Sequence, residues 1–151
     1  MSRKKIEESE QRLQKERKLL QDCFTQAPAE LAILKGPEYV FEFANPGYIQ
    51  LIGGRNPTGK KLLEALPEIA GQGIIELLDN VYKMGETFNG KEMPVMVDKG
   101  KGKPEQLYLN FTYQAFTNDK VEIEGILVFA YDITELVMAR KKLEAKDRKG
   151  G

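Results

Sequence analysis

Residues 125–135, which read GILVFAYDITE, decide how this chain folds. The stretch opens with a continuous apolar run from Ile126 to Tyr131, which is typical of a strand buried on both faces. Asp132 and Glu135 follow at the spacing of a helix capping box, with an acid in place of the usual hydroxyl residue. We therefore expect the strand to pass directly into a helix, so that strain in the core can reach an exposed element.

The composition limits both the size and the chemistry of the fold. At 151 residues the chain is long enough for one domain, and its 23 Lys and Arg balance its 23 Asp and Glu, so no global field favours nucleic acid or an anionic membrane. The sequence has one cysteine, no histidine, no apolar run long enough to span a membrane and no signal peptide. We expect a cytoplasmic protein without an internal disulfide, and histidine-based catalysis, metal ligation and haem ligation are excluded.

The second half of the chain predicts a helix followed by an antiparallel sheet. Over residues 73–83 the apolar residues recur on one face of a helix, and Gly85 is placed to end it. Three strands are expected next, at residues 87–97, 106–116 and 123–132. One face of the middle strand is apolar and should face the core; it consists of Leu107, Leu109, Phe111, Tyr113 and Ala115.

The first half predicts two short strands, residues 31–34 and 39–44, joined by a tight turn. Asn45 and Pro46 then begin a short helix, because asparagine is a favoured N-cap and proline is tolerated at the first helical position. Short helical pieces should make up residues 45–70.

Both ends of the chain predict solvated helices with thin apolar seams. Residues 2–24 contain a heptad seam, which indicates either a dimerising coiled coil or a solvated leader packed loosely on its own domain. That seam consists of Ile6, Leu13 and Leu20. The last helix places Leu136 and Leu143 on one seam with Ile133, and its basic end is typical of a solvated helix, with a basic membrane or nucleic-acid patch as the alternative.

In its order of elements and in two motifs, the chain resembles the PAS family of sensory domains. The motifs are residues 43–45 (FAN) with Tyr48, Leu51 and Gly53, and residues 125–134 at the end. The resemblance covers about residues 24–135. It implies an α+β fold, with a five-stranded antiparallel sheet in the order 2-1-5-4-3 and helices over one face that enclose a small cavity.

The same resemblance implies a module of a bacterial histidine kinase or a similar signalling protein of a two-component system. Residues 1–24 would form the N-terminal linker or dimerisation helix, residues 25–134 the sensory domain, and residues 135–151 the output linker helix. Coiled-coil-like helices would thus flank the domain. Asp132 and Thr134 would lie at the junction with the output helix.

Inward faces of the expected elements define the candidate residues of a ligand cavity. They are Phe41, Phe43, Tyr48, Leu62, Ile75, Leu78, Tyr82, Leu109, Phe111, Tyr113, Val128 and Ala130. These residues could also pack together with no ligand. The tyrosines favour a small polar or aromatic guest, because buried phenols require partners.

Cofactors are not expected. Aligned with the light-sensing flavin branch of the family, the chain has Leu62 in place of the adduct-forming cysteine, and Leu109 and Ala130 in place of the amides that hold the flavin ring. Cys23 is expected on the leader helix outside the cavity, so it is a poor haem ligand. Flavin and haem are therefore disfavoured, no metal site is expected, and an unidentified small organic ligand is the remaining candidate.

The sequence thus predicts a sensory domain that forms a homodimer and acts on a downstream kinase or other output domain. No enzymatic activity of its own, no nucleic acid and no membrane contact are expected. One alternative is a ligand-free dimerisation or protein-interaction module. A more remote one is a small enzyme that depends on a carboxylate, for which Glu42, Glu122 and Glu124 are the candidates.

Overall fold

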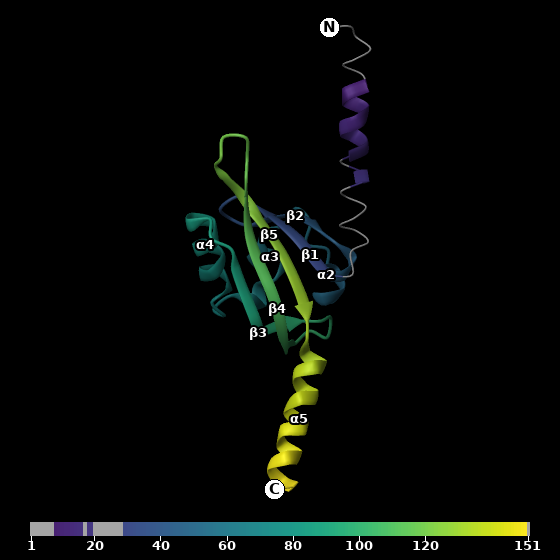
Figure 1. Cartoon of the computed structure of the whole chain (residues 1–151), viewed down its shortest axis with the longest axis vertical. Coiled ribbons are helices and arrows are strands. Elements are labelled where there is room, and N and C mark those ends of the chain that lie inside the picture. The colour runs from purple at the N-terminus through teal and green to yellow at the C-terminus, as the bar shows by residue number, and fades with distance from the viewer. Residues whose placement is uncertain (1–7, 17, 20–28, 151) are drawn as a thin grey trace.

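A computed structural model describes residues 8–16, 18–19 and 29–150. Five strands form one sheet, and α5 runs on from the end of the last strand and away from it (Figure 1). The elements are β1 (Glu30–Lys35), β2 (Val40–Ala44), α2 (Pro46–Leu51), α3 (Leu62–Ala65), the short 3-10 helix η1 (Pro67–Ile69), α4 (Ile74–Met84), β3 (Phe88–Asp98), β4 (Pro104–Thr117), β5 (Ile123–Asp132) and α5 (Thr134–Gly150).

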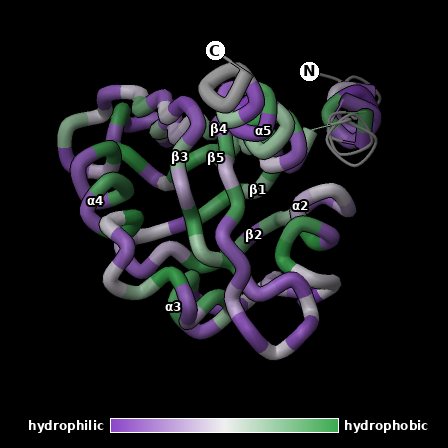
Figure 2. Tube along the Cα trace, turned by 90° about the horizontal axis from the view of Figure 1, so that it is seen from below, coloured by the Kyte–Doolittle hydropathy of each residue, from purple (hydrophilic) through white to green (hydrophobic). Residues whose placement is uncertain are grey.

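The strands lie in the order β2-β1-β5-β4-β3, and every neighbouring pair is antiparallel. The first and last strands of the domain, β1 and β5, are therefore paired at the centre of the sheet. Helices α2, α3 and α4 lie around one face of the sheet, and α5 starts beside β4 and β5 (Figure 2). This confirms the fold expected from the resemblance.

One buried side chain, Asn45, joins β1 to α2. Its Oδ1 accepts hydrogen bonds from the backbone N–H of Leu31 (3.0 Å) and of Tyr48 (2.9 Å), and its Nδ2 donates to the carbonyl of Ala29 (2.7 Å). Asn45 is fully buried and precedes Pro46 as the N-cap of α2, as predicted. The first turn of α2 is thereby held against the start of β1.

The amphipathic pattern of residues 73–83 forms α4, as expected. Ile74, Leu78 and Val81 are buried on one face of this helix. Gly85 ends it with φ at 73°, a left-handed conformation that glycine adopts without strain, and its N–H donates to the carbonyl of Val81 (2.8 Å).

The sheet has one buried face and one partly exposed face. On β4 the predicted core residues Leu107, Leu109, Phe111 and Tyr113 are buried, and Ala115 is half-buried. The expectation for β5 was wrong. Only one of its faces is buried, that of Ile126, Val128 and Ala130, whereas Leu127 and Phe129 are half-buried and Tyr131 is 54% exposed. The reason is that α2, α3 and α4 cover one face of the sheet only.

The capping box predicted at Asp132 and Glu135 is also absent. Strand β5 does pass almost directly into α5, but the Asp132 carboxylate accepts from the N–H of Thr134 (3.0 Å) and from its hydroxyl. Asp132 thus accepts from the N–H of the residue two positions later, whereas a capping box requires the N–H of Glu135, three positions later. The helix itself starts at Thr134.

The apolar seams at both chain ends face away from the core where the structure describes them. Residues 8–16 and 18–19 are helical, and Leu13 is 62% exposed, whereas Ile6, Leu20 and Cys23 lie outside the described residues. On α5, Leu136 and Leu143 are 67% and 63% exposed. The residue of α5 that packs on the domain is Val137, which is 1% exposed and which the heptad pattern did not indicate.

Replacing Asn45 with alanine should lower the free energy of unfolding by about 2–4 kcal/mol, because a helix cap is lost and buried backbone groups at Ala29 and Leu31 lose their partners. Urea denaturation measures this loss. The matched control is Asn56→Ala, which removes one exposed bond to Thr58 and should cost less than about 1 kcal/mol. Equal effects of the two substitutions would show that Asn45 does not hold the β1–α2 junction.

Candidate functional site

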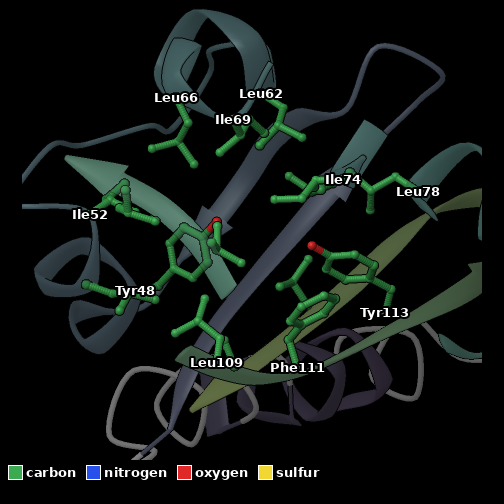
Figure 3. Close-up of a pocket in the computed structure, with 16 residues that line it drawn as sticks. Tyr48, Ile52, Leu62, Leu66, Ile69, Ile74, Leu78, Leu109, Phe111 and Tyr113 are labelled. Carbon is green, nitrogen blue, oxygen red and sulfur yellow. The ribbon is translucent and has the colours of Figure 1, made fainter. Parts of the chain in front are cut away.

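An apolar cavity of about 60 Å³ lies between the sheet and the helices (Figure 3). Strands β1, β3, β4 and β5 provide one wall, and α2, α3, η1 and α4 provide the other. Its lining residues are Leu34, Tyr48, Leu51, Ile52, Leu62, Leu66, Ile69, Ile74, Leu78, Val95, Val97, Leu109, Phe111, Tyr113, Val128 and Ala130. Apart from the hydroxyls of the two tyrosines, every side chain in this lining is a hydrocarbon.

Eight of the residues predicted from the sequence meet in this lining. They are Tyr48, Leu62, Leu78, Leu109, Phe111, Tyr113, Val128 and Ala130. The three positions that the flavin comparison singled out, Leu62, Leu109 and Ala130, are among them. The wall at these points therefore offers neither a thiol nor an amide.

Phe41 and Phe43 of β2 lie outside the lining. Phe41 is 1% exposed, but its ring packs against that of Tyr48 with the centroids 5.8 Å apart, so it supports the cavity wall from behind. Phe43 pairs in register with Ile33 and is only half-buried. Assigning both residues to the cavity was wrong. The register shift between β1 and β2 explains Phe43, because residues two apart in a strand share a face only where the pairing is regular, whereas Phe41 is buried against Tyr48.

Ile75 and Tyr82 of α4 also lie outside the lining. Ile75 borders a separate surface hollow beside Tyr39 and Asp79, and Ile74 takes the inward position instead. The ring of Tyr82 stands edge-on to that of Tyr39, with the centroids 6.1 Å apart. The error is one of helical phase, since the inward stripe of α4 runs through Ile74 and not through its neighbour.

The lining also contains residues that the sequence reasoning missed. They are Leu34, Leu51, Ile52, Leu66, Ile69, Ile74, Val95 and Val97. Alternation along β3 could have found Val95 and Val97, because residues two apart in a strand share a face. Leu66 and Ile69 belong to short helical turns around Pro67, whose orientation no periodic pattern indicates.

The phenols of Tyr48 and Tyr113 are the polar groups of the cavity. Burial raises the pKa of Tyr48, and burial also raises the pKa of Tyr113, with the nearby Tyr48 phenol adding to the effect. Both groups therefore stay protonated near neutral pH and can donate a hydrogen bond. Neither hydroxyl is hydrogen-bonded to another described residue, and neither oxygen is fully enclosed, since every fully enclosed side-chain nitrogen or oxygen in the described part of the chain has a partner.

An ion pair between Arg55 and Glu68 joins the helices to the end of β3. The guanidinium donates to both carboxylate oxygens (3.1 and 2.6 Å) and to the carbonyls of Ile52 (2.7 Å), Ala65 (3.2 Å) and Asp98 (2.8 Å). The Glu68 side chain is 8% exposed and also accepts from the N–H of Asp98 (2.9 Å). Burial alone would raise the pKa of Glu68, but the bonds from Arg55 and the backbone outweigh it and hold that pKa below its usual value of 4.5.

The turn after β3 extends this connection to the β5–α5 junction. The Asp98 carboxylate caps the turn by accepting from the N–H of Gly100 (2.9 Å). Gly53, which follows α2, packs so closely on Lys99 and Gly100 that a Cβ at Gly53 would collide with their backbone. The ammonium of Lys99 then lies 3.7 Å from the carboxylate of Asp132.

At the junction itself, Thr134 connects β5, α5 and β4. Its hydroxyl donates to Asp132 and accepts from the N–H of Tyr108 (2.9 Å), and the N–H of Ile133 donates to the carbonyl of Tyr108 (2.9 Å). The start of α5 therefore continues the hydrogen bonding of β5 to β4.

Side chains further along α5 reach back to the sheet. Lys141 donates to the Tyr108 hydroxyl (2.8 Å), which lowers the pKa of that phenol, and Arg140 forms a bidentate pair with Glu92 (2.5 and 2.8 Å). Glu92 lies in a β-bulge of β3 with φ at 51°, and its N–H donates to Asn110 (2.8 Å). The sequence reasoning missed these contacts, which join residues 33 and 48 positions apart.

Among the described residues, no group of three or more cysteine, aspartate or glutamate side chains could hold a metal ion. No helix in the same part of the chain is both long enough and apolar enough to cross a membrane.

Comparison with known proteins identifies the family. A family model described as the PAS fold matches residues 24–137, so the chain belongs to the PAS fold family. It is a sensory domain of that family, and the match includes the cavity lining and the junction at Asp132 and Thr134.

Solved structures share this fold at low sequence identity. VqmA of Vibrio cholerae, solved bound to DPO, is 21% identical with a TM-score of 0.60, and the match covers 74% of this chain and 55% of VqmA. A sensory box histidine kinase from Vibrio cholerae is 22% identical (TM-score 0.52, 82% of this chain and 93% of that one). An RNA-binding light-oxygen-voltage receptor is 14% identical (TM-score 0.66, 89% and 37%). The chain thus spans just over half of VqmA, and these likenesses show the fold alone.

The Glu68→Gln variant should be less stable than the wild type by about 1–3 kcal/mol at neutral pH, because a charge-assisted bidentate pair is lost. The folded pKa of Glu68 lies below 4.5, so this advantage of the wild type should be complete above pH 4.5 and should disappear as the pH falls through the folded pKa. Urea denaturation across this pH range measures the difference. Glu86→Gln is the exposed control and should be as stable as the wild type at every pH. A stability difference between the wild type and Glu68→Gln that does not change with pH would contradict the lowered pKa of Glu68.

Proposed function

We propose that this domain senses a small organic ligand in the apolar cavity and transmits its presence through β5 to α5. One observation carries the proposal: a single strand, β5, contributes Val128 and Ala130 to the cavity wall and ends at Asp132, whose carboxylate holds the first turn of α5. Ala130 of the cavity wall is therefore only two residues from Asp132, so a change in how the wall packs acts close to the start of α5.

The Arg55–Glu68 connection supports a second route from the helices to the same point. A ligand that displaces Ile52 or Ile69 moves elements that are bonded, through Asp98 and its turn, to Lys99 beside Asp132. The ligand shifts the equilibrium between two arrangements of α5. The free energy of this shift cannot exceed the difference between the ligand's binding free energies for the two arrangements.

We further propose that the domain works as a homodimer in the cytoplasm and controls a downstream output domain, such as a histidine kinase of a two-component system. The exposed leucines Leu13, Leu136 and Leu143 support dimerisation, because large apolar residues on solvated helices gain by pairing. Among the structures that share the fold are a sensory histidine kinase and the dimer of VqmA, a DNA-binding receptor. The kinase is the output we favour for this chain.

The other candidates have less support. The hydrocarbon lining at Leu62, Leu109 and Ala130 disfavours flavin, and the absence of histidine from the sequence disfavours haem. For an enzyme, the candidate carboxylates lie outside the cavity: Glu42 and Glu124 each pair with Lys35 at 3.3 Å, and Glu122 is exposed. A ligand-free dimerisation module is the strongest rival.

Native mass spectrometry of the purified protein tests ligand and dimer together. We expect a dimer, part of which carries the additional mass of a small organic molecule. Leu136→Lys combined with Leu143→Lys should shift the dimer toward monomer, whereas Leu63→Lys, which charges a 46% exposed leucine of α3, should leave it intact. A dimer that never carries additional mass would favour the ligand-free module, and a monomer would contradict dimerisation.

Asp132→Ala should loosen the start of α5, because the N–H and the hydroxyl of Thr134 lose their acceptor. Hydrogen exchange at residues 134–137 should become about threefold to tenfold faster, as expected for one lost hydrogen bond of about 1 kcal/mol. Asp119→Ala, in an exposed turn, is the matched control and should leave exchange at these amides unchanged.

The same amides test transmission from the cavity. Ala130→Leu adds volume to the cavity wall and should change their exchange when Asp132 is present. In the Asp132→Ala background the change should be smaller. An equal change in both backgrounds would exclude Asp132 from the route.

A further inference from the structure

Two phenols approach the same cavity from opposite walls. Tyr48 comes from α2 and Tyr113 from β4, and their hydroxyls point into the space between the leucine and isoleucine side chains (Figure 3). Each tyrosine is less than 9% exposed, and the pKa of Tyr113 is raised in part by Tyr48, as expected for neighbouring phenols.

These hydroxyls have no partner among the described residues, although other buried polar side chains in the domain do. Asn45 bonds three backbone groups and Glu68 bonds Arg55 and Asp98. Among the described residues, no fully enclosed side-chain nitrogen or oxygen lacks a hydrogen-bond partner, so both phenol oxygens border open space, and the space they point into is the cavity. Two donors aimed into one space can therefore bind an acceptor that the chain itself does not provide.

The remaining lining restricts the chemistry of that partner. Since no charged side chain lines the cavity, a charged molecule would be buried without a counter-charge, which is strongly unfavourable. The volume of about 60 Å³ is well below the roughly 150 Å³ of a dry cavity that admits benzene. A guest as large as a single ring would therefore require shifts of the lining side chains.

We infer that the cavity takes a compact uncharged molecule of at most one ring, whose hydrogen-bond acceptor, such as a ring nitrogen or a carbonyl oxygen, is held by the hydroxyls of Tyr48 and Tyr113. This inference rests on the proposed function and names the class of its ligand.

The positions of the two phenols give such a molecule a direct effect on the fold. Asn45 holds the first turn of α2, and Tyr48 lies in that turn. Tyr113 is paired in register with Val128 of β5. An acceptor shared by both hydroxyls therefore bridges the helical wall to the strand that ends at the junction with α5.

Pyridine and benzene provide a matched pair of probes, since they share size and shape and differ in one acceptor. Binding is measured by chemical-shift titration of the whole chain at mildly alkaline pH, where pyridine is uncharged. We expect pyridine to bind about threefold to tenfold more tightly than benzene. This ratio is the gain in affinity that one or two hydrogen bonds between uncharged groups provide. Tyr48→Phe and Tyr113→Phe should each reduce this preference and together abolish it, while benzene binding is retained.

Tyr82→Phe is the control, because it removes a phenol that lies outside the lining, and it should preserve the preference. Equal binding of the two probes to the wild type would overturn the inference and leave a ligand-binding cavity intact. A preference that survives in the double phenylalanine variant would also overturn it. If neither probe binds, the stated ligand class is wrong, and native mass spectrometry then decides whether the cavity binds any ligand at all.

Discussion

The hydrogen bonds of Asn45 are the constraint on which the rest of the domain depends. This one side chain satisfies the backbone of Ala29, Leu31 and Tyr48, and so fixes the start of β1 against the start of α2. Because β1 pairs with both β2 and β5, the same bonds set the helical wall of the cavity relative to the centre of the sheet. The position of the Tyr48 phenol follows from them.

A second polar anchor explains how the cavity can remain open. The Arg55–Glu68 pair and its backbone partners hold the helices at the end of β3, and one of these partners is the carbonyl of Ile52, a residue of the lining. An unfilled volume of 60 Å³ costs roughly 1–2 kcal/mol at about 24 cal/mol per Å³. The net contribution of one charge-assisted hydrogen bond is of similar size, about 1.5–3 kcal/mol. The anchors can therefore offset the cavity, and a guest that fills it recovers this energy.

The sequence predicted the elements whose apolar residues recur at a regular spacing. It did not predict the features that depend on a single contact between distant residues. The alternation in β4 and the helical period of α4 identified Leu109, Phe111, Tyr113 and Leu78 correctly as inward-facing, because every turn or pleat repeats the signal. The apolar run of β5 hid its alternation, since Phe129 and its neighbours on the outer face are apolar too.

Other features were not predictable from periodicity. Arg55 and Glu68 lie 13 residues apart across several short turns, and Asp98 is 30 residues further on. The contact of Val137 with the domain depends on where α5 begins, and that point is set by Asp132 and Thr134. The start of α5 is fixed by backbone bonds to β4, whereas beyond it the helix is held by side-chain contacts at the surface, such as Arg140–Glu92, which water and salt screen. The far part of α5 can therefore move at small cost, as the proposed transmission from the cavity to α5 requires.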